Sequence, residues 1–331
     1  IFFLFFLVFF FFFFYFLGVL FVGGGVWFLG GLGVLGPMVV PAPAEACFFW
    51  QACARRRGRA SNTRVGGKRS GFIRGGNNAA VPYVITPRNT WVGEPPDRVR
   101  WNGVAGSSGY TVRLWHWVYG RNSPSLVLWE TVVDAADGNE IAFPDISLEL
   151  GDYYSIEVIT EDGVSSNLDE GAYYAGFQLL APEDYGLLRS HLTQVNTDNA
   201  NNPIEDAALA QAGVYFLDEL YADALRVLEP LVLSPAASDL VYIALGDIYN
   251  ETGLNQLSLR AYDQALKIAT SNGDRLSEAT IRVKLADVYG GLDDVDQAQE
   301  LLVEARQLYV QLGESLEVAI LDRRLRALSA L

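Results

Sequence analysis

LGDIYNETGLNQLSLRAYDQA, residues Leu245–Ala265, is the stretch of sequence that decides the fold of the C-terminal part. Small residues at Gly246 and Ser258 stand on either side of a Thr-Gly turn, so that two antiparallel helices can approach closely. Tyr249 and Tyr262 supply the bulk that fills the space beside this contact. Because such a helix pair leaves its apolar flanks uncovered, it needs neighbouring pairs to bury them.

The same pattern occurs three times, first at a distance of 34 residues and then at a distance of 40 residues. The copies share a small residue in the first helix, a tyrosine three positions later and a small residue in the second helix: Ala212, Tyr215 and Ala224; Gly246, Tyr249 and Ser258; Ala286, Tyr289 and Ala298. The 40-residue period continues beyond the third copy. It predicts that Ser315–Ala330 is one more first helix, which closes the stack as a cap.

This pattern resembles the tetratricopeptide repeat (TPR) family over about Asp206–Leu331, most closely at Tyr242-x-x-Leu245-Gly246-x-x-Tyr249. The other two copies carry Ala in place of Gly. The 40-residue spacing is similar to the longer-helix variant of motor light chains and bacterial adaptors. The resemblance implies a superhelix of helix pairs, whose concave face binds an extended peptide or a partner helix.

The resemblance also maps the ligand-facing positions of the family onto this sequence. They are Leu209, Gly213 and Phe216 in the first copy, Ile243, Asp247 and Asn250 in the second, and Val283, Asp287 and Gly290 in the third. Asp247 and Asp287 replace the Asn and Lys with which some TPR domains clamp a peptide carboxylate. A groove with two aspartates favours a protein partner with a basic or amide-rich segment. The alternative is that both aspartates are solvated or cap neighbouring helices.

Before the helices, the sequence changes to short, alternating apolar runs separated by turn residues. The predicted strands are Val81–Ile85, Arg98–Trp101, Tyr110–Val118, Leu126–Val133, Glu140–Phe143, Tyr153–Thr160 and Tyr173–Leu180. About seven short strands in roughly 100 residues predict an antiparallel, all-β immunoglobulin-like sandwich.

Parts of this region resemble fibronectin type III-like domains, over about Pro82–Leu180. Val99–Trp101 together with Tyr110–Val112 is similar to strands B and C of that family, and Gly151–Val158 is similar to its strand F. Trp115 and Trp117 are an addition to the family pattern, and they share one face of their strand. They are either core and edge aromatics or an exposed platform for a glycan or peptide.

The N-terminal part is hydrophobic and is followed by a basic stretch. Ile1–Val22 carries no charge and is long enough to cross a bilayer, which takes about 20 apolar residues. Ala42-Pro43-Ala44 fits a signal-peptide cleavage site. A cleaved signal, an uncleaved anchor and a fragment or imperfect gene start all remain open. The Arg-rich flank Arg55–Arg74 favours a cytoplasmic side, whereas the cleavage site favours export.

The charges and reactive residues argue against several functions. From Glu94 onward the chain has fifteen basic and thirty-eight acidic residues, which opposes binding to nucleic acid. The two cysteines, Cys47 and Cys53, precede the folded part, so it has no disulfide framework or thiolate metal site. The two histidines, His116 and His191, lie far apart in the sequence. We therefore expect no catalytic site, cofactor or metal.

Together these patterns predict a multidomain protein with five segments. They are a hydrophobic signal or membrane anchor (residues 1–46), a basic flexible linker (47–80), a β-sandwich (81–181), a connecting helix and loop (182–204) and TPR-like repeats with a capping helix (205–331). The expected function is a non-enzymatic interaction scaffold or assembly factor, exported or membrane-tethered in a bacterial envelope. The alternatives are a glycan- or peptide-binding module that uses the sandwich, and an accessory subunit of an enzyme complex. The sequence does not predict the oligomeric state.

Overall fold

The computed structural model describes residues 74–117, 125–172 and 175–328, which lie in one compact unit, Phe49–Leu331. In the other unit, Ile1–Phe48, it describes the backbone of β1 (Val19–Val22), β2 (Gly25–Gly30) and β3 (Gly33–Val34), which form a small sheet. Apart from these strands, the predicted signal or anchor lies outside the described residues. Within the described part of the chain, no helix is both long and apolar enough to cross a bilayer.

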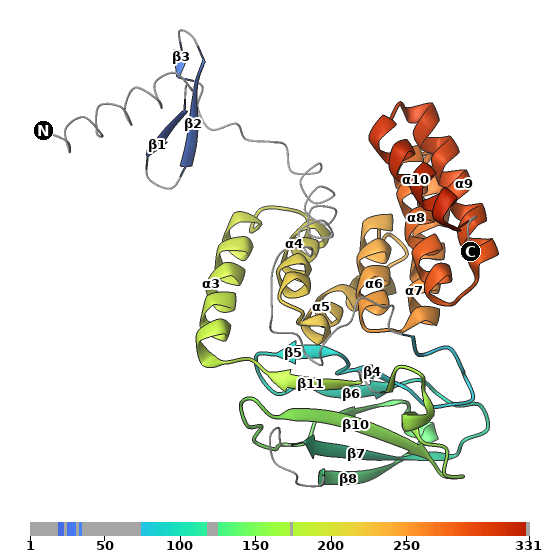
Figure 1. Cartoon of the computed structure of the whole chain (residues 1–331). Coiled ribbons are helices and arrows are strands. Elements are labelled where there is room, and N and C mark those ends of the chain that lie inside the picture. Colours follow the sequence, from blue (N-terminus) through green and yellow to red (C-terminus); the bar gives the residue numbers. More distant parts are fainter. Residues whose placement is uncertain are drawn as a thin grey trace, which may run out of the picture. The chain divides into compact units, whose positions relative to one another are not determined.

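Two sheets precede the helices (Figure 1). Their strands are β4 (Val84–Thr86), β5 (Thr90–Val92), β6 (Arg98–Trp101), β7 (Gly109–Trp117), β8 (Leu126–Asp134), β9 (Glu140–Ala142), β10 (Tyr153–Thr160) and β11 (Gly176–Leu179). One sheet has the order β5-β11-β10-β7-β8, and the other has the order β4-β6-β9. All pairs are antiparallel except β5 with β11.

Alternation along the strands builds a single apolar core from both sheets. On β7, Tyr110, Val112 and Leu114 are buried, while the residues between them are only partly covered. Trp101 from the smaller sheet meets Tyr110 edge-to-face, with ring centroids 5.5 Å apart. The predicted strands agree with those observed, and the structure adds β5. Three residues were too few for β5 to show an alternating pattern.

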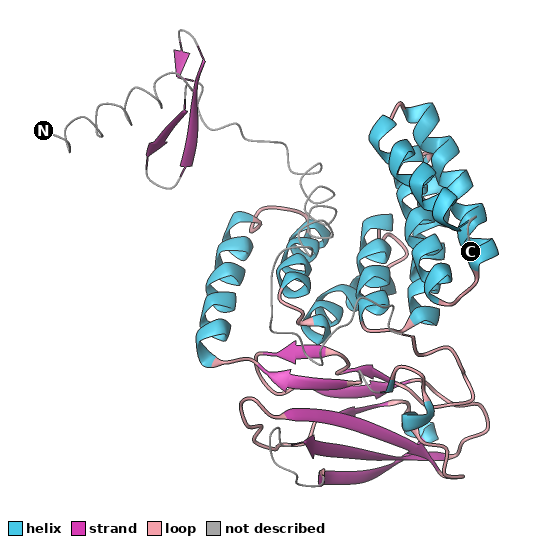
Figure 2. Cartoon of the chain, viewed as in Figure 1, coloured by secondary structure: helices cyan, strands magenta, loops and turns pink. Residues whose placement is uncertain are grey.

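The rest of the chain is helical (Figure 2). The helices are α3 (Pro182–Asp198), α4 (Ile204–Leu217), α5 (Tyr221–Leu228), α6 (Asp239–Glu251), α7 (Asn255–Asn272), α8 (Arg275–Gly291), α9 (Val295–Leu312) and α10 (Ser315–Leu328), with a 3-10 helix, η4 (Glu229–Leu233), after α5. α4 pairs with α5, α6 with α7 and α8 with α9, and α10 packs on α9. α3 packs on α4, and its Leu188 belongs to the apolar core that α4, α5 and α6 share.

The turns inside the three helix pairs are equivalent, as the repeat predicts. In each turn a backbone N–H donates to the carbonyl of the repeated tyrosine: Leu220 to Tyr215 at 2.8 Å, Leu254 to Tyr249 at 2.8 Å and Asp294 to Tyr289 at 3.0 Å. In each turn the residue immediately before this donor adopts a left-handed conformation: Glu219, Gly253 and Asp293. These positions are again 34 and 40 residues apart, so the structure confirms the repeat.

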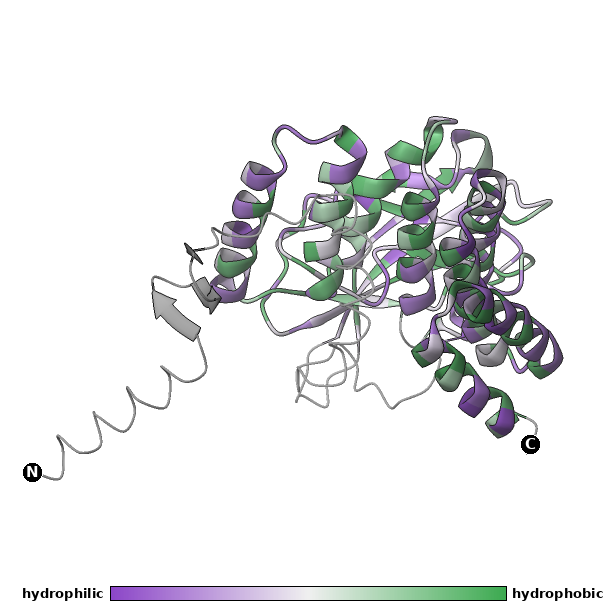
Figure 3. Ribbon diagram, turned by 90° about the horizontal axis from the view of Figure 1, so that it is seen from above, coloured by the Kyte–Doolittle hydropathy of each residue, from purple (hydrophilic) through white to green (hydrophobic). Residues whose placement is uncertain are grey.

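The predicted close contact between helices at Gly246 and Ser258, which we call the small-residue seam, is also present. The Ser258 hydroxyl donates to the Gly246 carbonyl at 2.9 Å, across α6 and α7. A Cβ atom added to Gly246 would lie 2.4 Å from the ring of the buried Tyr262. The predicted close approach of these two helices is therefore confirmed. Figure 3 shows the resulting division of the helices into hydrophobic and hydrophilic sides.

The sheets are fixed to the helices by residues 88–91, which run from the loop after β4 into β5 and which we call the clamp segment. Trp91 N donates to the Glu219 carbonyl at 3.0 Å, in the turn between α4 and α5. Asn89 Nδ2 donates to the Glu251 carbonyl at 2.9 Å, at the end of α6. The clamp segment thus binds the tips of two successive helix pairs.

Arg88, the first residue of the clamp segment, is buried and bonds both regions. Its Nε donates to the Thr252 carbonyl at 2.8 Å, and its Nη2 pairs with Asp169 Oδ2 at 2.9 Å. The side chains of Arg88 and Asp169 are only 1% and 5% exposed. Asp169 also accepts from Gly76 N at 2.7 Å, which ties the chain before β4 to the same point. Gly75 N donates to Asn255 Oδ1 at 3.0 Å, so two residues of a stretch that the sequence placed in a flexible linker contact both the sheet region and α7.

We predict that Gly246→Ala lowers the free energy of unfolding by about 1–3 kcal/mol, because the added methyl group overlaps the Tyr262 ring. Gly186→Ala, in the second turn of α3, is the matched control, because an added Cβ meets no atom within 4 Å there. The control should be neutral or stabilising by up to about 1 kcal/mol through helix propensity. Urea unfolding followed by circular dichroism measures both changes. Equal effects of the two substitutions would contradict the close seam.

We predict that Arg88→Met destabilises the protein by about 3–5 kcal/mol, because it leaves the Asp169 carboxylate buried without its counter-ion. Arg98→Gln is the control, because Arg98 and Glu140 form an exposed pair worth at most about 1 kcal/mol. Thermal unfolding of the two variants beside the parent protein tests this difference. A loss below about 1 kcal/mol for Arg88→Met would mean that the pair does not hold the two regions together.

Candidate functional site

The structure divides the predicted ligand-facing residues of the helices into two groups. Leu209, Phe216 and Ile243 are buried in the helical core, and Gly213 is buried with them. The partly exposed residues are Asp247, Asn250, Val283, Asp287 and Gly290. The second group is accessible at the surface of the helices, whereas the first group belongs to their core.

Asp247 on α6 is held by groups from two other helices. Lys284 Nζ on α8 lies 2.7 and 2.9 Å from its two carboxylate oxygens. The hydroxyl of Tyr262 on α7 also donates to it. Lys284 lies 6.0 Å from the centre of the Tyr262 ring, within the range of a cation–π contact. The carboxylate therefore links two successive first helices.

Asp287 on α8 repeats this arrangement one pair later, with Arg324 on α10 as its partner. Both basic partners stand 37 residues after their aspartate, and the two pairs are 40 residues apart. Burial raises the pKa of Asp287, and Arg324 opposes this rise. The two aspartates do not cap helices; that role belongs to Asp274 and Asp294. The repeated basic residue was visible in the sequence, but its contact across repeats was not predicted.

The two tryptophans of β7 lie on one face of the larger sheet, as predicted. Trp115 Nε1 donates to Glu157 Oε2 at 2.9 Å, and Trp117 Nε1 donates to Ser155 Oγ at 3.0 Å. Trp117 is 46% exposed, whereas Trp115 is partly buried. His116 points to the other face and stacks on Tyr154 at 5.0 Å. Binding of a glycan or peptide to the tryptophan face stays a prediction.

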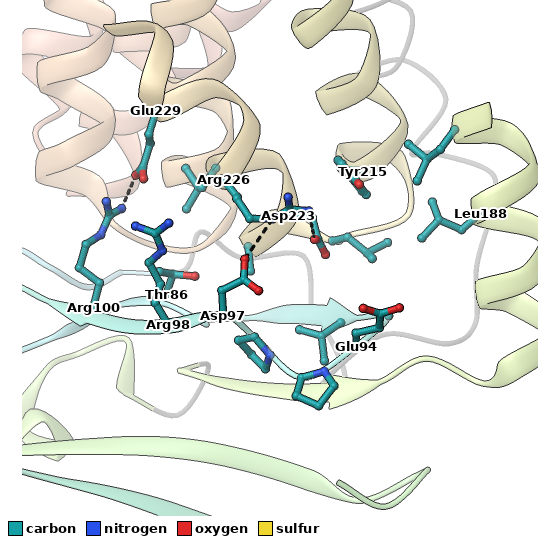
Figure 4. A pocket seen from close by; sticks show the side chains of 18 of the residues that line it. Thr86, Glu94, Asp97, Arg98, Arg100, Leu188, Tyr215, Asp223, Arg226 and Glu229 are labelled. Carbon is teal, nitrogen blue, oxygen red and sulfur yellow. Dashed lines mark hydrogen bonds and ion pairs between the residues drawn. The ribbon is translucent and has the colours of Figure 1, made fainter. Parts of the chain in front are cut away.

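A cleft of about 430 Å³ lies where the sheets meet the helices (Figure 4). Its walls are the end of β4 and the chain from β5 into β6 on one side, and α3, α4, α5 and η4 on the other. Tyr185 on α3 donates its hydroxyl hydrogen to Glu94 at 2.7 Å across this cleft. Burial raises the pKa of Tyr185 to about 12, and Glu94 adds to the rise. The sequence did not indicate the cleft, because its two walls are far apart along the chain.

The described side chains show no metal site. No group of three or more His, Cys, Asp or Glu residues among them is placed to hold a metal ion.

Comparison with known proteins identifies the helical part. The tetratricopeptide repeat family model matches residues 238–310, from just before α6 into α9. No curated protein matches the chain. Among solved structures, the crystal structure of BtubC (BKLC) from P. vanneervenii is similar at 18% identity and a TM-score of 0.37. That match covers 43% of this chain and 63% of the other, so less than two thirds of BtubC is spanned. Residues 238–310 therefore match tetratricopeptide repeats, the helical repeat region fits a superhelix of such repeats, and a β-sheet region precedes it.

Proposed function

We propose that this protein is a non-enzymatic scaffold or assembly factor that holds a segment of a partner protein on the concave face of its TPR helices. The family match supports protein binding as the general role. The face consists of Asp247, Asn250, Val283 and Asp287, which are partly exposed on α6 and α8. Two of these four side chains are carboxylates, and carboxylates attract basic and amide groups. The partner segment is therefore basic or amide-rich.

The observation that carries this proposal is the repeated pairing of an aspartate with a basic residue of the next first helix. Asp247 pairs with Lys284, and Asp287 pairs with Arg324. A partner lysine, arginine or amide that enters the groove shares these carboxylates or displaces their basic partners. The partner must therefore compete with Lys284 and Arg324, which makes recognition sensitive to both charges.

The other segments complete this proposal. We infer a fibronectin type III-like sandwich from the two sheets, whose strand order and shared core support that family. We also propose that residues 1–46 export the protein or tether it to the membrane of a bacterial envelope. Their apolar composition and the Ala42-Pro43-Ala44 motif support this location. The cytoplasmic side is the alternative.

A second candidate function uses the tryptophan face of the larger sheet. The exposure of Trp117, next to Trp115 on the same face, supports a glycan- or peptide-binding module. The role of accessory subunit in an enzyme complex is a third candidate. In it the same TPR groove would hold a catalytic partner.

We predict opposite effects of two substitutions in the groove. Asp247→Asn should weaken binding of the partner roughly tenfold, because the proposed basic or amide group of the partner loses its charged acceptor. Lys284→Gln should preserve or strengthen binding, because it removes the competing cation. The partner is first recovered by crosslinking the full chain in its cells and mapping the crosslinked residues. Isothermal titration calorimetry with the purified partner then gives the affinities.

The control is Trp117→Ala, which should leave the affinity of this partner unchanged. Crosslinks that map to β7 and β10, together with loss of binding in this variant, would favour the second candidate function. Unchanged affinity for Asp247→Asn in a normally folded protein would contradict the groove.

A further inference from the structure

The cleft between the sheets and the helices has the size and lining of a binding site. At about 430 Å³, it falls within the usual range of ligand pockets, about 300–1,000 Å³. Its floor is apolar and is formed by the buried side chains of Val92, Leu188, Leu220 and Leu225. Pro95 and Pro96 lie side by side in the sequence of one wall. An apolar side chain of a ligand therefore finds a matching surface inside the cleft.

The acidic groups of the cleft already have partners. Asp223 lies 2.8 Å from Arg226, and Asp97 lies 3.7 Å from the same arginine. Glu94 accepts from Tyr185. Glu229 accepts from the Tyr249 hydroxyl at 2.8 Å and also pairs with Arg100. A basic ligand would therefore have to displace one of these contacts.

The two arginines of β6 have guanidinium N–H groups that make no hydrogen bond within the described part of the chain. Arg98 and Arg100 are two residues apart on one strand, so their side chains leave the same face. Figure 4 shows both reaching up from β6 toward the helices. Among the described residues, Arg98 pairs with Glu140 through one nitrogen, and the Nε of Arg100 is buried without a hydrogen-bond partner. A guanidinium has five N–H donors, so Arg98, whose side chain is 49% exposed, retains donors that a ligand can reach.

We propose that this cleft binds an extended peptide segment of a protein partner, with a carboxylate of the segment at Arg98 and Arg100 and an apolar side chain on the floor. Guanidinium groups recognise carboxylates through paired, charge-assisted hydrogen bonds. The carboxylate belongs either to an Asp or Glu side chain or to the C-terminus of the peptide. This site differs from the TPR groove in its position and in the charge that it selects.

The test is a selection of random heptapeptides on the full chain, followed by affinity measurements with the synthetic peptides. We expect the selected peptides to share an acidic group next to apolar residues. Arg98→Gln should weaken their binding roughly tenfold, because a charge-assisted hydrogen bond is lost. Fluorescence anisotropy with labelled peptides measures this change, and Arg98→Gln is suitable because its ion pair is exposed.

Arg189→Gln is the matched control, because Arg189 lines the same cleft from α3 but lies beside the Tyr185 ring. Its effect should stay within about twofold. Amidation of the peptide C-terminus distinguishes the two sources of the carboxylate: loss of binding identifies the terminus, and retained binding identifies a side chain. Selected peptides without an acidic group, or equal affinity for the parent protein and Arg98→Gln, would overturn the proposal.

Discussion

The buried ion pair of Arg88 and Asp169 is the contact on which the arrangement of the folded part depends. Burial of a charged pair is costly unless further hydrogen bonds satisfy both groups. Here the Thr252 and Val84 carbonyls accept from the guanidinium, and Gly76 N donates to the carboxylate. These partners come from the sheets, from the chain before them and from a helix turn. The pair is therefore satisfied only when all three are assembled.

This arrangement decides which surfaces remain for partners. The clamp segment occupies the turns of the first two helix pairs, so those two tips are closed to a ligand. The sides of the first helices stay partly exposed, and on them Asp247 and Asp287 each face a basic residue of the next first helix. The same junction creates the cleft, because neither the sheets nor the helices have both of its walls. The contact between the two regions thus underlies the cleft, whereas the groove is built by residues of the helices alone.

The sequence predicted what depends on local spacing. The helix turns repeat because the tyrosine, the small residues and the left-handed turn position recur at 34 and 40 residues. The strands followed from alternation. The clamp segment was not predicted, because Arg88 looks like one more cation in a basic stretch until Asp169 is folded beside it. The cleft was missed for the same reason: Arg100 and Glu229 meet only across 129 residues. Leu209, Phe216 and Ile243 were predicted to face a ligand but are buried. Their burial depends on how the helices pack, which the positions taken from the family resemblance do not specify.

Differential scanning calorimetry of the full chain tests the central claim most directly. If the buried pair and the clamp segment join the sheets and helices into one cooperative unit, residues 74–328 unfold in a single transition. The calorimetric enthalpy of that transition then equals its van't Hoff enthalpy. Two separate transitions, one for the sheets and one for the helices, would contradict this account.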